Sequence, residues 1–198
     1  MLGNKTIAVV VPAYNEEKQI GRVIETMPEF VDRIIIVNDS SLDDTESKIK
    51  AYLNTEYNNT RMPVEEEQIN QTFYNEADLF LEKMNKQELK FFTPSRIINE
   101  NPVNSRIILI TNLKNIGVGG SIARGYKWCK DHNMDCTAVM AGDGQMDPDE
   151  LESICSPVIN ERIDYVKGNR LIHRSANVFI PRVRFFGNSI LSLVSCQL

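Results

Sequence analysis

Short runs of β-branched residues recur along this chain, each followed by a polar loop and a helix-like segment. The runs are residues 6–12 (TIAVVVP), 33–37 (RIIIV), 106–111 (RIILIT) and 136–140 (CTAVM). Helical spacing of apolar residues follows at 15–27, where we expect Asn15 to be the cap, and at 121–132, 148–160 and a segment ending near residue 53. Continuous apolar strands are typical of a parallel sheet covered on both faces. The alternation therefore predicts an α/β domain with a central, mostly parallel sheet flanked by helices.

Residues 54–105 interrupt this alternation. They are rich in Asn, Glu, Gln and Lys and contain one helix-like stretch at 77–89, so we interpret them as a partly helical insertion. The alternation resumes afterwards and ends with a short strand predicted at 165–167. A length of 198 residues suits a single domain over the entire chain, 1–198. The last residues form an apolar run that stops abruptly, which we interpret as a C-terminal truncation.

The distribution of charge disfavours some partners and favours others. The formal net charge is −5, whereas a dedicated nucleic-acid binder normally shows a basic surface. One stretch, 165–184, has no acidic residue and holds five basic ones: Lys167, Arg170, Arg174, Arg182 and Arg184. Such a stretch suits a phosphate-bearing ligand or an anionic membrane surface, although an ordinary solvated basic face has the same composition.

Cysteine usage and hydropathy bear on the cellular compartment. The four cysteines form no C-x-x-C pair, which is typical of reduced thiols in a cytosolic protein. The sequence shows neither a signal-peptide core nor an apolar stretch approaching the ~20 residues of a transmembrane helix. We therefore expect a cytoplasmic location. Residues 179–198 place apolar side chains on one helical face, a pattern shared by interfacial membrane helices and ordinary core helices.

Three polar loops directly follow predicted strands, at residues 12–16 (PAYNE), 38–45 (NDSSLDDT) and 142–148 (GDGQMDP). Ligands of open α/β sheets bind beyond the carboxyl ends of the strands, so the three loops together predict a site. In the second loop, Asp39 could accept a hydrogen bond from a base N–H, which suits uracil or guanine. In the third, Asp143 between two glycines could reach a divalent cation that bridges a diphosphate. Each loop on its own is equally consistent with a turn that caps the next helix.

Taken in order, these loops resemble those of the family 2 glycosyltransferases, which have the GT-A fold of nucleotide-diphospho-sugar transferases. A fourth motif, Asn-x-Gly-x-Gly at 115–119, also matches, and the resemblance covers the chain apart from the insertion. Within the family, residues 167–170 (KGNR) and 181–188 (PRVRFFGN) are most similar to the dolichyl- and polyprenyl-phosphate sugar synthases. The resemblance implies an inverting hexosyltransferase of cell envelope polysaccharide biosynthesis. It would move a sugar from a GDP- or UDP-sugar to a polyprenyl or dolichyl phosphate, at the cytoplasmic face of the membrane.

The resemblance also implies roles for particular residues. Those that would bind the nucleotide sugar are Pro12, Ala13, Tyr14, Glu16, Asp39, Gly117, Gly119 and Asp143. Those that would serve the reaction are Asp143, Gln145 and Arg170, with Asp143 also holding Mg²⁺ or Mn²⁺. Those that would meet the acceptor phosphate are the five cations Lys167, Arg170, Arg174, Arg182 and Arg184.

One departure from the family pattern keeps other readings open. The metal motif of the family is usually Asp-x-Asp, and Ala141 occupies its first position here. Metal binding should then be weaker, or the ion arrives already bound to the nucleotide. A catalytically weak or inactive nucleotide-sugar-binding module therefore remains an alternative, as does a transferase with a saccharide acceptor. A nucleotidyltransferase lacks support because the first loop is not glycine-rich, and a dinucleotide-binding domain would need a third spaced glycine after Gly119.

Overall fold

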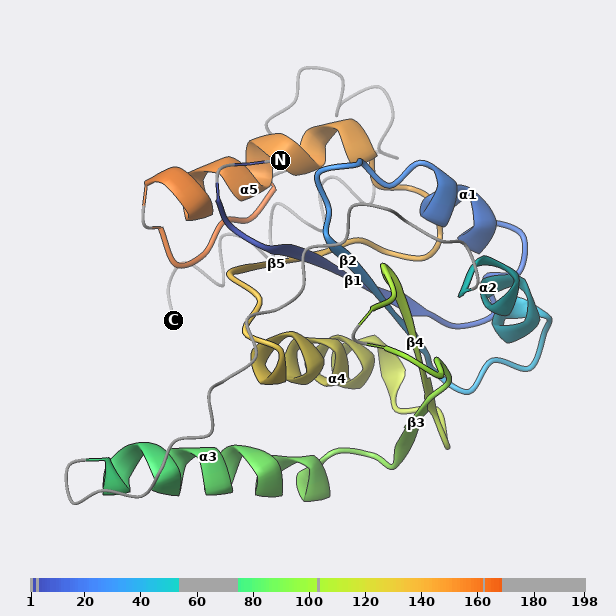
Figure 1. The fold of residues 1–198 in the computed structure, drawn as a ribbon. Coiled ribbons are helices and arrows are strands. Elements are labelled where there is room, and N and C mark those ends of the chain that lie inside the picture. Colours follow the sequence, from blue (N-terminus) through green and yellow to red (C-terminus); the bar gives the residue numbers. More distant parts are fainter. Residues whose placement is uncertain (1, 3, 54–74, 103, 162, 169–198) are drawn as a thin grey trace, which may run out of the picture. The chain divides into compact units, whose positions relative to one another are not determined.

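The computed structural model describes residues 2, 4–53, 75–102, 104–161 and 163–168. The chain divides into two compact units, residues 1–163 and 164–198. All helices and strands within the described residues belong to the first unit (Figure 1). The predicted limits of a single catalytic domain over 1–198, with an insertion at about 54–105, stay a prediction.

A five-stranded sheet forms the centre of the first unit. Its strands are β1 (Ile7–Ala13), β2 (Arg33–Asn38), β3 (Ser95–Ile97), β4 (Ile107–Asn112) and β5 (Cys136–Val139). They lie in the order β3-β4-β2-β1-β5, and all neighbouring pairs are parallel except the antiparallel pair of β3 and β4. The predicted α/β fold with a mostly parallel central sheet is therefore confirmed.

Helices cover both faces of this sheet, as continuous apolar strands require. One face packs against α1 (Ile20–Glu25), α2 (Thr45–Leu53) and α5 (Leu151–Asn160), and the other packs against α4 (Gly117–Asp131) (Figure 1). Side chains alternate between the faces along each strand: Val9 faces the first group, and Val10 faces Trp128 of α4. The helix α4 comes close to the sheet because Gly125, which has no Cβ, faces the side chain of Val10.

The described part of the insertion contains a helix, α3 (Glu76–Glu88), a 3₁₀ turn, η1 (Leu89–Phe91), and the edge strand β3. The helix agrees with the prediction at 77–89, whereas β3 was not expected because three residues are too few to show a period. A buried ammonium group joins the insertion to α4: Lys127 donates to the backbone carbonyl of Asn85 and contacts Asp131 and Glu88.

Two predicted helix starts and one predicted strand are wrong. The first helix begins at Ile20, because Asn15 has a positive φ of 57° and its side-chain oxygen accepts from the backbone N–H of Leu42. The fourth helix begins at Gly117, four residues before the predicted start. The short strand predicted at 165–167 is absent, since these described residues have no strand conformation. The predicted helical face at 179–198 lies outside the described residues.

Candidate functional site

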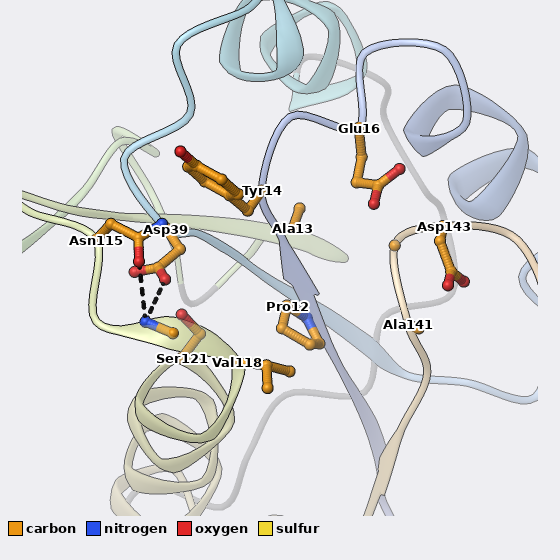
Figure 2. Close-up of a pocket in the computed structure, with 12 residues that line it drawn as sticks. Pro12, Ala13, Tyr14, Glu16, Asp39, Asn115, Val118, Ser121, Ala141 and Asp143 are labelled. Carbon is orange, nitrogen blue, oxygen red and sulfur yellow. Dashed lines mark hydrogen bonds between the residues drawn. The ribbon is translucent and has the colours of Figure 1, made fainter.

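A cavity of about 390 Å³ opens where the parallel strands end at their carboxyl edge (Figure 2). It is bounded by the loops after β1, β2 and β5 and by the first turn of α4. The residues that line it are Pro12, Ala13, Tyr14, Glu16, Asp39, Asn115, Gly117, Val118, Ser121, Ala141, Gly142 and Asp143. Three loops far apart in the sequence thus meet at one site, as the rule for open α/β sheets predicts.

Hydrogen bonds join the first loop to the second. The backbone N–H of Asn15 donates to Ser41 Oγ over 3.0 Å, and that of Glu16 donates to Thr45 Oγ1 over 2.8 Å. In return, the backbone N–H of Leu42 donates to Asn15 Oδ1 over 2.8 Å. Because backbone groups of both loops have fixed partners, the first loop presents its side chains from a defined position.

The third loop approaches the first so closely that a side chain would not fit. The backbone N–H of Gly142 donates to the carbonyl of Pro12 over 3.2 Å. A Cβ at Gly142 would lie 3.0 Å from that carbonyl oxygen and 3.4 Å from the Cβ of Ala13. The glycine before Asp143 therefore has a packing role, and it brings the Asp143 carboxylate to the edge of the cavity (Figure 2).

The Asp39 carboxylate, only 3% exposed, binds the start of α4. Its Oδ2 accepts from the backbone N–H of Gly117 over 2.7 Å, and its Oδ1 accepts from that of Ile116 over 3.0 Å. The Asn112 side chain donates to Oδ1 over 2.9 Å. Asp39 thus supplies the partner that the first N–H groups of a helix lack within the helix itself. The expectation that Asp39 contacts a base stays a prediction.

Two carboxylates on one side of the cavity, Glu16 and Asp143, repel each other (Figure 2). The pKa of Glu16 is raised above its ordinary value of 4.5, first by partial burial and then by the negative charges of Asp143 and Asp43. A cation between these carboxylates would relieve the repulsion, because it would favour their charged forms.

We predict that Glu16→Gln stabilises the protein at pH 7. A carboxyl group with a raised pKa in the folded state binds more protons there than in the unfolded chain, so stability falls as pH rises from about 4.5 through the raised pKa. Removing the charge should therefore raise the melting temperature at pH 7 and leave it unchanged near pH 4, where the wild-type side chain is already protonated. An equal change at both pH values would contradict this electrostatic origin.

The structure brings together most of the predicted donor-site residues. Seven of them line the cavity: Pro12, Ala13, Tyr14, Glu16, Asp39, Gly117 and Asp143. Gly119 lies two positions after Gly117 in the first turn of α4 and is exposed. Gln145 lines a neighbouring cavity of about 280 Å³, together with Arg22 and Asp147.

Of the predicted acceptor residues, the structure describes Lys167 alone, which is exposed and belongs to the second unit. Arg170, Arg174, Arg182 and Arg184 lie outside the described residues. Their roles, like those of the donor-site residues, stay predictions.

Sequence reasoning missed several lining residues on α4 and next to it. Val118, 66% exposed, and Ser121 both line the cavity, yet the helix was expected to begin only at Ser121. Asn115 lines it as well and had been noted only as part of a motif. They could have been found from the true start of α4. That start depends on hydrogen bonds from the backbone N–H groups of Ile116 and Gly117 to Asp39, which lies 77 and 78 positions earlier in the sequence.

We predict that Gly119→Ala stabilises the fold and weakens donor binding. A Cβ at this helical position would meet no atom within 4 Å, and alanine is favoured over glycine in a helix by roughly 0.5–1 kcal/mol. If the donor approaches Gly119 as the family resemblance implies, the added methyl group should lower affinity for a nucleoside diphosphate. Urea unfolding and titration calorimetry measure the two effects. The same change at Gly125 should destabilise, because its Cβ would collide with Val10. A stabilised Gly119→Ala variant with unchanged affinity would contradict the role of Gly119.

Two properties of the described residues bear on metal binding and on membranes. They contain no cluster of three or more histidine, cysteine, aspartate or glutamate side chains able to hold a metal ion. None of the helices in this part of the chain is long and apolar enough to cross a bilayer.

Comparison with known proteins agrees with this geometry. The family model of glycosyl transferase family 2 matches residues 8–71, which contain the first two loops. A UDP-N-acetylglucosamine–dolichyl-phosphate N-acetylglucosaminyltransferase of Methanococcus voltae is 29% identical over 195 residues, covering 98% of this chain and 63% of the relative. An uncharacterized protein of Methanocaldococcus jannaschii is 23% identical over 190 residues, covering 96% and 56%. The chain thus spans about three fifths of the length of these relatives.

Among solved structures, glucosyl-3-phosphoglycerate synthase from Mycobacterium tuberculosis in complex with uridine diphosphate is 40% identical to 24% of this chain. The match covers 19% of that protein, and the TM-score of 0.23 gives it no weight for the fold. The sheet, the cavity at its carboxyl edge and the matched region are consistent with one another. Residues 8–71 of this chain are similar to glycosyl transferase family 2, and the relative from Methanococcus voltae extends the likeness over 98% of the chain.

Proposed function

We propose that this chain transfers a sugar from a GDP- or UDP-sugar to a polyprenyl or dolichyl phosphate, with inversion at the sugar. The observation that carries the proposal is the cavity in which the first two loops, both within the matched family region, meet the third loop and the start of α4. The relative from Methanococcus voltae, whose name states a dolichyl-phosphate acceptor, supports this choice of acceptor. An acceptor at a membrane agrees with a cytoplasmic protein that associates peripherally with the bilayer.

The cavity offers suitable partners for each part of a nucleotide donor. Tyr14, 45% exposed, and Val118 provide apolar surface for a flat base (Figure 2). The first turn of α4 opens on the cavity at Gly117 and Val118, but the negatively charged Asp39 already accepts from the backbone N–H groups of Ile116 and Gly117, so this end of the cavity suits the base rather than the diphosphate. A nucleoside diphosphate would then place its base near Asp39 and its phosphates towards Asp143.

The residues at the third loop fit a divalent cation only in part. Asp143 accepts from the backbone N–H of Gln145 through one oxygen, which leaves its other oxygen available. Ala141 offers no ligand, so Asp143, with Glu16 beside it, would share Mg²⁺ or Mn²⁺ with the diphosphate oxygens of the donor. When bound, the cation would neutralise charge on the departing diphosphate.

With a polyprenyl phosphate as acceptor, the reaction would need no catalytic base from this chain. A sugar hydroxyl must lose a proton when it attacks, whereas a polyprenyl phosphate is already an anion near neutral pH. The task of the protein is then to hold two anionic substrates together, which the cations within 165–184 would do by offsetting their repulsion. Attack from the face opposite the diphosphate gives inversion.

A transfer assay tests the proposal. The purified chain is incubated with a radiolabelled UDP- or GDP-sugar, Mn²⁺ and a short-chain polyprenyl phosphate in detergent. The proposal expects label to enter the organic phase and the product to have the inverted anomeric configuration. Label in a water-soluble product made only when a saccharide is added would favour the saccharide acceptor. Nucleotide binding without any transfer would favour the inactive binding module.

A further inference from the structure

The insertion exposes a group of large apolar side chains. Within residues 80–97 they are Phe80, Leu81, Met84, Leu89, Phe91 and Ile97, which we call the apolar surface of the insertion. They lie on α3, η1 and β3, and Phe91 is 88% exposed. Single exposed apolar residues are normal on a protein, whereas a group of them marks contact with another protein or with a membrane.

The insertion is held firmly against α4. The buried Lys127 ammonium donates to the carbonyl of Asn85 over 2.8 Å, and the buried Arg124 donates from Nε to Ser95 Oγ over 2.8 Å. Figure 1 shows α3 beside α4, on the side away from the sheet. The apolar surface is therefore presented to solvent by a fixed part of the first unit.

The exposed charges around the apolar surface are of one sign. Among the side chains that the structure describes in 80–97, those both charged and exposed are Lys83, Lys90 and Arg96. The two acidic residues of this stretch, Glu82 and Glu88, are half-buried, and Glu88 pairs with Lys127 and Lys130. Because the formal net charge of the chain is −5, this cationic surface does not follow from overall composition.

Apolar side chains between exposed cations match the surface of an anionic bilayer. The apolar groups enter the boundary between headgroups and acyl chains, and the cations are attracted by lipid phosphates. A lysine stem can lie along the apolar layer while its ammonium stays among the headgroups. A second copy of the chain fits less well, because symmetric contact through this surface would bring its cations together.

The apolar surface also borders the donor cavity. The backbone N–H of Leu113 donates to the carbonyl of Pro94, just before β3, over 2.9 Å. Leu113 and Lys114 are exposed, and the next residue, Asn115, lines the cavity. A bilayer against the apolar surface would therefore lie next to a loop of the cavity.

We propose that the apolar surface of the insertion docks the protein on an anionic bilayer. The inference rests on the proposed function, since a polyprenyl phosphate acceptor resides in such a bilayer. The docking residues differ from the basic stretch 165–184, so membrane contact and binding of the acceptor phosphate are separate tasks of separate residues.

Co-sedimentation with vesicles tests the proposal. The chain is mixed with vesicles of phosphatidylcholine and phosphatidylglycerol, or of phosphatidylcholine alone, and the bound fraction is measured against lipid concentration. The wild type should bind the anionic vesicles at least about tenfold more tightly, and added salt should remove most of this difference.

Two double variants address the two kinds of contact. Phe80→Ser with Phe91→Ser should weaken binding to anionic vesicles at least about tenfold, because two aromatic side chains no longer leave water. Lys83→Gln with Lys90→Gln should weaken it about twentyfold, since each cation contributes about fivefold, and should reduce the salt dependence. The matched controls, Leu42→Ser on the second loop and Lys48→Gln on α2, change exposed residues elsewhere and should bind as the wild type.

Three results would overturn the docking. The first is absence of binding to either kind of vesicle by a chain shown by circular dichroism to be folded. The second is unchanged binding by both double variants, which would place membrane contact elsewhere, for example at 165–184. The third is a dimer in sedimentation velocity that the double phenylalanine variant separates, which would assign the surface to a second copy.

The transfer assay separates this docking from the proposed function. In detergent, both double variants should transfer sugar as the wild type does, because none of the changed residues lines the cavity. With the polyprenyl phosphate in vesicles, their transfer should fall at least about tenfold, in line with their binding. Absence of transfer by the wild type in detergent would contradict the proposed function, and co-sedimentation would still decide the docking.

Discussion

Replacing Asp143 with asparagine is expected to lower sugar transfer at least about a hundredfold without destabilising the fold. Removing one group that stabilises developing charge typically costs 10²–10³ in rate. Asparagine keeps an oxygen that can accept from the Gln145 N–H, so the turn should survive. It also removes a charge that repels Glu16, so the free energy of unfolding should rise rather than fall. Initial rates of the transfer assay and thermal unfolding measure the two effects.

The matched control for this change is Asp149→Asn, at the second residue of the 3₁₀ turn η2 (Pro148–Glu150). Asp149 is exposed and does not line the cavity, so transfer by this variant should equal that of the wild type. If Asp143→Asn retained wild-type transfer at every concentration of Mn²⁺, Asp143 would have no part in the reaction. The metal role implied by the family resemblance would then be lost as well.

Replacing Asp39 with alanine is expected to destabilise the protein by about 2–4 kcal/mol. Three N–H groups would lose a bond to a charged acceptor, and such a hydrogen bond contributes about 1.5–3 kcal/mol. The sum is not reached, because the Gly117 N–H keeps Asn115 Oδ1 and the Asn112 amide keeps Ser121 Oγ. We expect α4 to loosen at its first turn, so nucleotide binding should fall together with stability.

Urea unfolding of Asp39→Ala and Asp39→Asn separates the two roles of this residue. The asparagine variant keeps one oxygen to accept from α4, and its stability should lie between those of the alanine variant and the wild type. If it folds fully and still fails to bind any nucleotide, Asp39 acts on the ligand directly. A loss below about 0.5 kcal/mol in the alanine variant would contradict the structural role, because changes of that size are typical of surface positions without such bonds.

The location of the candidate site could be predicted from the sequence. The strands at 7–13, 33–38 and 107–112 are continuous apolar runs, and such runs report burial on both faces without any knowledge of their neighbours. Parallel strands all end at one edge, so the polar loops that follow them had to meet there. For the same reason, residues such as Tyr14, Asp39 and Asp143 were expected to gather at one place, and the structure brings them to one cavity.

What surrounds those residues depends on contacts between distant segments, which a local pattern does not show. The backbone N–H of Gly117 donates to Asp39, 78 positions earlier, and this hydrogen bond holds the start of α4. Because α4 starts there, Val118 and Ser121 line the cavity. The side chain of Asn15 accepts a hydrogen bond from the backbone N–H of Leu42 in the second loop. Asn15 is therefore held outside the first helix, which begins at Ile20. The sequence by itself determined the strands and the edge where the polar loops meet, because local burial patterns report them. Only the tertiary structure decided which hydrogen bonds that edge still offers, because the partners of Asp39 and Asn115 come together through folding.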